Sequence, residues 1–419
     1  MDPGAVTADR SGGRRGLSMH LWPEPETRGG LGLLRACRVE RRDGTPPAGA
    51  VTLWYSLPDL GPSERPEPDE PFLIAATIQA MAEGRDLVLH GTASAELLGN
   101  LAEFCDAWHR WRPETFARVD IGAERTTPRG VARRRGAGVA VSYSGGVDSS
   151  WTIWRHVNGL AGPRSRGITH AVFVHGFDIP LADAAAFEAG CGRAAPLLAA
   201  LGISLVPVRT NFRDALPYYW EMAYGVALAS CFHQLRPHCG EALVASSRPY
   251  DVLAFPMGSN VITDALLSSA ELQVVHDGAG LNRCEKVAGL AEWPAGLAAL
   301  RVCWEGIPRD RNCGRCEKCV RTMHNFLVAG LPIPPSFDRA PTLSQVEQVR
   351  LRSRSLAEEW NQLVVAADRN GVLAPWVRVA RRKVAQYWRR AALREAASQL
   401  ARATLPTGVR HFMRRAVYA

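Results

Sequence analysis

The sequence predicts an α/β protein: a doubly wound parallel sheet with a small N-terminal α/β unit and a helical C-terminal tail. Five short apolar runs lie between residues 139 and 275, and segments with helical spacing separate them. Parallel strands need crossover connections and bury both faces, so this alternation is typical of a sheet covered by helices on both sides. An apolar fraction of 47% in 419 residues allows at least one full hydrophobic core.

The N-terminal region contains fewer regular elements. Residues 1–28 are rich in Gly, Arg and Pro, and we expect them to be poorly ordered. Residues 51–56 and 87–90 are predicted strands, and 93–111 has the apolar spacing of a helix. Proline, glycines and a basic run make 125–138 a predicted linker.

The central strands follow in order, and helices succeed them. The apolar runs expected to form the parallel sheet are 139–143, 171–175, 203–208, 242–245 and 272–275. After about residue 335 charges dominate, and two helical stretches are expected at 343–367 and 376–403. These elements predict an accessory domain at 1–135, a nucleotide domain at 136–335 and a basic helical region at 336–419.

Charge is concentrated at one end of the chain. The formal net charge is +9, and residues 377–419 hold eleven Lys or Arg against one acid, 11 − 1 = +10, so the rest is near neutral. The tail interleaves arginines with apolar residues, which is typical of a basic helix that holds RNA phosphates, lies on an anionic surface or covers its own domain. No run approaches the roughly 20 apolar residues of a membrane span, and residues 1–15 lack the apolar core of a signal peptide. We expect a cytoplasmic protein.

The strongest motif follows the first central strand. Two glycines allow a tight turn, and the next helix adds free N–H groups and a partial positive charge, so the segment forms an anion cradle. Asp148 is expected to cap this helix or help to hold Mg²⁺ beside the phosphates. The predicted phosphate-binding residues are Ser144, Gly145, Gly146, Val147, Asp148, Ser149 and Ser150.

This loop lacks the lysine of the Walker signature. It resembles the Ser-Gly-Gly-x-Asp-Ser loop of the PP-loop ATP pyrophosphatases, which have an adenine nucleotide α-hydrolase-like fold. The resemblance implies that a substrate oxygen attacks the α-phosphorus of ATP, that Mg-pyrophosphate leaves into the loop, and that a second nucleophile displaces AMP.

A cysteine cluster lies downstream with the spacing C-x9-C-x2-C-x2-C, formed by Cys303, Cys313, Cys316 and Cys319. Four thiolates in one short knuckle match a structural tetrahedral zinc site. An Fe–S or redox site and four unligated cysteines are the alternatives.

The cysteine motif also resembles the knuckle of the 7-cyano-7-deazaguanine synthase family. In this chain Arg321 comes one position earlier than that family's arginine, and Arg283-Cys284-Glu285-Lys286-Val287 resembles the family's Lys-x-Glu-Ile-Val segment. The resemblance implies catalytic roles for Asp148, Arg283 and Lys286; surface charges at a helix start are the alternative for the two cations. It covers about 138–335 and does not extend to the family's substrate segment.

Further pocket candidates lie at the carboxyl ends of predicted strands, where doubly wound sheets bind ligands. They are His175, Asn211 and Ser246, assigned to the nucleotide. The two resemblances together imply an ATP-dependent, AMP-forming ligase with ATP, Mg²⁺ and Zn²⁺. It would activate a small-molecule or protein carboxylate for an amine or ammonia donor. A tRNA-modifying enzyme and a non-catalytic ATP-binding module are the alternatives, and a homodimer, RNA and an anionic surface are left open as partners.

Overall fold

The computed structural model describes residues 16–29, 32–43, 49–61, 68–129 and 136–404. The chain divides into two compact units, 1–312 and 313–419. Among the described residues, no helix is both long enough and apolar enough to cross a bilayer.

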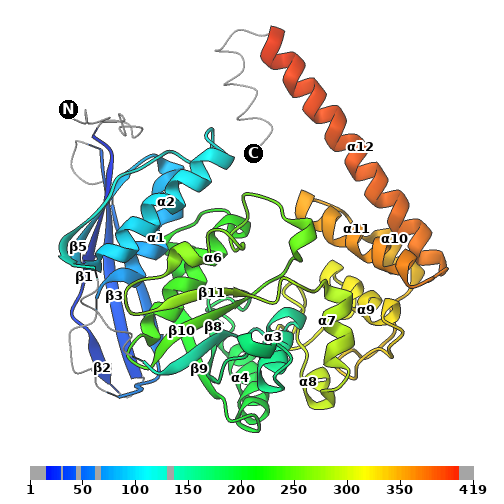
Figure 1. Ribbon diagram of the computed structural model, residues 1–419. Helices are drawn as coiled ribbons and strands as arrows, with labels where there is room; N and C mark the ends of the chain where they lie inside the picture. The colour runs from blue at the N-terminus through cyan, green and yellow to red at the C-terminus, as the bar shows by residue number, and fades with distance from the viewer. Residues whose placement is uncertain (1–15, 30–31, 44–48, 62–67, 130–135, 405–419) are drawn as a thin grey trace. The chain divides into compact units, whose positions relative to one another are not determined.

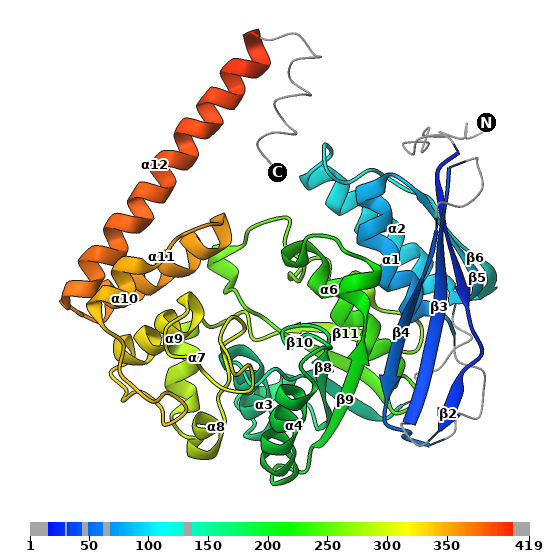
Figure 2. The same ribbon diagram turned by 180° about the vertical axis from the view of Figure 1, so that it is seen from behind.

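The first unit is built on one eleven-stranded sheet of mixed direction, in the order β11-β10-β7-β8-β9-β4-β3-β1-β5-β6, with β2 on β3 (Figures 1 and 2). Its strands are β1 (Ser18–Pro23), β2 (Thr27–Gly29), β3 (Gly32–Arg42), β4 (Ala50–Leu57), β5 (Asp86–Ser94), β6 (Ile121–Thr127), β7 (Gly138–Ser142), β8 (Ile168–His175), β9 (Ser204–Thr210), β10 (Cys239–Ala245) and β11 (Gln273–Asp277).

The five strands from β7 to β11 are all parallel and have the spatial order β11-β10-β7-β8-β9. The chain reverses direction across the sheet after β9, so β7 and β10, which are not consecutive, lie side by side. Ligands of open α/β sheets bind where such a reversal separates neighbouring strand ends. The five predicted central strands are confirmed, and the loop after β7 lies at this reversal point.

Helices cover both faces of this parallel region (Figure 1). The crossover helices α3 (Val147–Val157) and α4 (Ala184–Ala199) follow β7 and β8 and pack on those strands. On the other face lies α6 (Trp220–Phe232), and beside it α1 (Glu70–Glu83) and α2 (Ala95–Trp111) pack on the N-terminal strands β1, β5 and β6. Buried residues of the N-terminal elements and of α6 belong to one continuous core.

The N-terminal strands join this sheet through an antiparallel pair: Tyr55 of β4 lies opposite Thr210 of β9. The predicted strands at 51–56 and 87–90 and the helix at 93–111 are confirmed as β4, β5 and α2.

Two expectations about the N-terminal region are wrong. The segment before residue 28 is not irregular from Ser18 on, because Met19 and Leu21 of β1 alternate into the core; residues 1–15 lie outside the described chain. The expected linker at 125–138 begins inside β6, and 130–135 lie outside the described residues.

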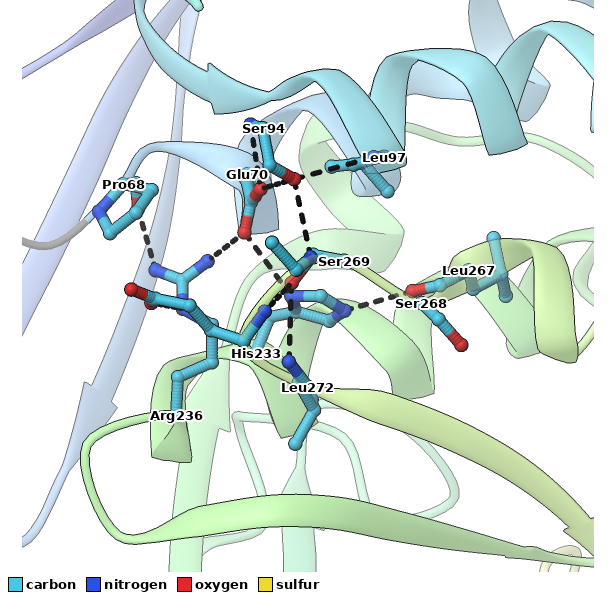
Figure 3. Close-up of polar contacts among 12 residues, drawn as sticks. Pro68, Glu70, Ser94, Leu97, His233, Arg236, Leu267, Ser268, Ser269 and Leu272 are labelled. Atoms are coloured by element: carbon cyan, nitrogen blue, oxygen red, sulfur yellow. Dashed lines mark hydrogen bonds and ion pairs between the residues drawn. The ribbon is translucent and has the colours of Figure 1, made fainter. Parts of the chain in front are cut away.

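A buried charged cluster ties α1 to the segment after α6 (Figure 3). The Glu70 carboxylate accepts a hydrogen bond from Arg236 at 2.6 Å and from the Ser94 hydroxyl at 2.6 Å. Arg236 also donates to the carbonyl of Pro68, and the Nε2 of His233 donates to the carbonyl of Leu267 at 2.8 Å. Burial raises the pKa of Glu70, but the neighbouring His233 ring, 3.8 Å away, and the charge of Arg236 outweigh it and hold that pKa well below its usual range.

Smaller helices complete the first unit. They are α5 (Phe212–Ala215), α7 (Arg283–Leu290) and α8 (Pro294–Ala298), with single 3-10 turns at Gly162–Arg164, His233–Leu235, Tyr250–Val252 and Ala265–Leu267. Helix α7 begins with a capping box in which Asn282 and Glu285 each bond the other's backbone N–H. This cap fixes where the cationic side chains of its first turn lie.

The second unit is helical: α9 (Glu317–Val328), α10 (Leu343–Gln348), α11 (Arg354–Arg369) and α12 (Pro375–Thr404). The expected helix at 343–367 is two helices, because Val349 leaves the helical conformation and Ser353 starts a new helix as its N-cap. The expected helix at 376–403 is confirmed as α12.

Candidate functional site

The phosphate-loop candidate connects β7 to the N-terminus of α3. Gly145 has φ +76°, a conformation that favours glycine. The Ser149 hydroxyl donates to the carbonyl of Gly146 at 3.2 Å, and the amide of Ser144 donates to the Ser149 hydroxyl at 3.3 Å. These internal bonds hold the loop closed across the first turn of the helix, where free N–H groups favour anions.

Asp148, in the first turn of α3, carries the negative charge of the loop. Its carboxylate accepts a hydrogen bond from Arg283 at 2.7 Å and from Lys286 at 3.1 Å, and both of these residues lie on α7. Burial raises the pKa of Asp148, but the attraction of Arg283 and Lys286 outweighs it and keeps this pKa well below its usual range. The structure thus brings together the three residues to which catalytic roles were assigned.

Lys286 links the Asp148 carboxylate to the end of the neighbouring strand β10. Its side chain is 1% exposed and donates to the backbone carbonyl of Ser246, directly after β10. The amide of Ser246 in turn donates to the carbonyl of Asp277, the last residue of β11, at 2.7 Å. The carboxyl ends of β7, β10 and β11 are therefore joined around the loop.

Two other predicted nucleotide residues have partners of their own. His175 ends β8, and its Nε2 lies 2.9 Å from the carbonyl of Pro180 while its ring stacks on Phe187. Burial lowers the pKa of His175. The Asn211 amide pairs with β4, donating to the carbonyl of Thr52 and accepting from the amide of Trp54. Roles for His175 and Asn211 in nucleotide binding stay predictions.

The four cysteines come together, with sulfur atoms all within 4.8 Å of one another. Sulfurs around a tetrahedral zinc ion with about 2.3 Å bonds lie about 3.8 Å apart. Backbone amides donate to three of the sulfurs: Gly306 to Cys303, Cys316 to Cys313 and Cys319 to Cys316. Such N–H bonds stabilise thiolates, and none of the four is in a disulfide. The donor set fits one zinc ion.

Two residues that sequence reasoning missed hold the segment before the knuckle, and one of them bonds the phosphate loop. The backbone amide of Arg301 donates to the carbonyl of Gly145 at 2.7 Å, and its buried guanidinium donates to the carbonyl of Cys303 at 3.1 Å. Asn312 accepts from the amides of Val302 and Cys303 and donates to the carbonyl of Leu300. The proximity of Arg301 to Cys303 is the only sequence signal for this link.

The loop and the cysteine cluster carry the same two motifs from which the resemblance was argued, and a comparison of sequences agrees with it. The chain resembles 7-cyano-7-deazaguanine synthase. It is 24% identical over 147 residues to the enzyme of that name from Thiobacillus denitrificans (strain ATCC 25259 / T1). The match covers 34% of this chain and 62% of the relative, so it spans less than two thirds of that enzyme. No family model and no solved structure matches the chain.

Proposed function

We propose that this protein is an ATP-dependent adenylating enzyme of the PP-loop type, which forms AMP and pyrophosphate while it activates a carboxylate or carbonyl oxygen for attack by nitrogen. The observation that carries the proposal is the contact of Asp148 with Arg283 and Lys286 at the reversal point of the parallel sheet. Formally the three groups sum to 2 − 1 = +1, so the cluster retains charge for a polyphosphate. The distant similarity to 7-cyano-7-deazaguanine synthase supports it.

The residues of the loop suit the departure of pyrophosphate rather than transfer of the terminal phosphoryl group. Backbone N–H groups from Gly145 to the start of α3 would bind the phosphate oxygens, with hydroxyls of Ser144 and Ser149 at the rim. Arg283 and Lys286 would neutralise the charge that develops on the leaving pyrophosphate, and Asp148 would hold these cations in place or bind Mg²⁺. A substrate oxygen attacks the α-phosphorus, and a nitrogen nucleophile then displaces AMP from the acyl adenylate.

The cysteine cluster would hold zinc as a structural ion, because four thiolates fill the coordination sphere and leave no position for substrate. In this role the metal fixes the segment that carries Arg301, which bonds the phosphate loop. The proposal gives no step of the reaction to the metal.

The test is the release of pyrophosphate and AMP from ATP and Mg²⁺ with a panel of carboxylic acids and ammonia. We expect the double variant Ser144→Ala, Asp148→Asn to reduce the rate at least 100-fold, because it removes a hydroxyl of the loop and the anchor of both cations. The control is Asp338→Asn, which removes an exposed carboxylate and should leave the rate unchanged. Formation of ADP and phosphate instead of AMP and pyrophosphate would show the proposal to be wrong.

A further inference from the structure

Helix α12 (Pro375–Thr404) has two chemically different sides. One side packs within the second unit: Trp376, Val377, Ala380 and Val384 are buried. Contacts with the neighbouring helices fix it in place, because Lys383 donates to the carbonyl of Val349 at 3.0 Å and Arg354 lies over the ring of Trp388. The first half of α12 is therefore held on a rigid base.

The opposite side of α12 is basic and exposed. A residue in an α-helix turns about 100° from the one before it, which places Arg378, Arg382 and Arg389 within about 40° of one line, with Arg390 about 80° to one side of Arg382. These four arginines, the basic face, are all exposed. Within the described chain none of them pairs with an acid, whereas Arg381, outside the face, pairs with Asp368.

The composition of the basic face distinguishes between anionic partners. A helix that lies on a membrane surface needs bulky apolar side chains beside its cations, to enter the lipid. In α12 Trp376, Val377 and Val384 are buried in the protein, Val379, Tyr387 and Trp388 are half-buried, and among the described side chains of the helix Leu393 is the one large apolar side chain that is exposed. One exposed leucine among the arginines offers little apolar area to enter lipid, whereas the guanidinium groups can bind phosphate.

We propose that the basic face of α12 binds the phosphate backbone of a double-helical nucleic acid, without reading its sequence. Arginine guanidinium groups pair well with phosphates, and four of them along three turns of one rigid helix match a ligand with regularly repeated charge. Glu395, the one acid among the described side chains of the helix, lies on the other side, so it does not weaken the face. The inference stands independently of the adenylation chemistry.

The experiment measures fluorescence anisotropy of a labelled RNA hairpin and a labelled DNA duplex of equal length, titrated with the full-length protein at several salt concentrations. We expect binding of at least one probe, and a loss of at least 10-fold in affinity in the triple variant Arg382→Gln, Arg389→Gln, Arg390→Gln. Because about 0.7 to 0.9 counterions are released per phosphate, the slope of log affinity against log salt should fall by about 2.

The matched control is Arg110→Gln, Arg164→Gln, Arg339→Gln, which removes the same charge from exposed positions elsewhere and should bind as wild type. Replacing the three face arginines by lysine should restore most of the affinity. Circular dichroism shows that the variant is folded. The proposal is wrong if neither probe binds, if both triple variants lose affinity equally, or if the face is needed for vesicles of anionic lipid but not for nucleic acid.

Discussion

Asp148 and the four cysteines are the residues whose surroundings the sequence predicted best. Each belongs to a short motif. The residues that contact them are therefore either close in the chain or part of a second recognisable motif. The contact of Asp148 with Arg283 and Lys286 joins two such motifs across 135 and 138 positions. The resemblance assigned these three residues to one site, and only folding could bring the two helices together.

Asn211 was assigned to the nucleotide from sequence, and its neighbours could not have been foreseen. Its position directly after a central strand favoured a ligand contact. In the structure its amide pairs with the backbone of β4, because the N-terminal strands extend the sheet beyond β9. A residue at the end of a strand can bind a ligand or a neighbouring strand, and local sequence does not distinguish these cases.

The first prediction concerns the cysteine cluster. The double variant Cys316→Ser, Cys319→Ser removes two of four thiolates, so we expect it to lose the roughly one zinc per chain that the wild type should carry. Mass spectrometry of metals after purification measures this directly.

Cys105→Ser is the matched control, because this buried cysteine lies in α2 and is outside the cluster. It should retain full zinc content. Iron in the wild type in place of zinc, or undiminished zinc in the double variant, would contradict the assignment.

Among the elements, α1 is held to the rest of the first unit by a buried ion pair as well as by apolar packing. Glu70 is 1% exposed and Arg236 is 0% exposed. The sequence showed neither partner, since α1 was not predicted: its residues are buried on nearly every side, so the apolar periodicity that marks a surface helix is missing. The ion pair became visible only once α1 and α6 were found side by side.

We predict that Glu70→Gln lowers the free energy of unfolding by about 3 to 5 kcal/mol, because it leaves the buried Arg236 without its countercharge. Urea denaturation of the variant and of the wild type measures the difference. The folded-state pKa of Glu70 is depressed, so the stabilisation is present at neutral pH and is lost as the pH falls below the ordinary value of about 4.3.

Glu114→Gln removes an exposed carboxylate of the same unit and serves as the control. If the two variants were equally stable at pH 7, the cluster in Figure 3 would not contribute to the free energy of unfolding.

In the whole molecule, the two compact units should respond differently to acid. In the second unit His324 is 2% exposed, lies against the ring of Trp376 and bonds the carbonyl of Val320 at 2.7 Å. Burial lowers the pKa of His324 from 6.5 to about 4. The unfolded chain therefore takes up a proton at higher pH than the folded chain, and acid favours unfolding.

We predict that the second unit loses up to about 3 kcal/mol of stability between pH 6.5 and pH 4 through His324. Hydrogen exchange of peptides from α11 and α12 at pH 7 and pH 5 should show increased opening at the lower pH. The increase should largely disappear in His324→Gln and persist in His109→Gln, which changes a histidine of the first unit. Equal pH dependence in all three proteins would exclude His324 as the cause.

The sequence by itself determined the five parallel strands, the anion loop after the first of them, the spacing of the cysteine cluster and the basic helix at the end. Each of these is written in neighbouring residues, through apolar runs, glycine placement, thiol spacing or charge. Tertiary structure alone decided that N-terminal strands continue the same sheet, that α7 delivers two cations to Asp148, that Arg301 bonds the phosphate loop, and which side of α12 stays exposed. These depend on which distant segments pack together, and long-range packing leaves no periodic signal in the local sequence.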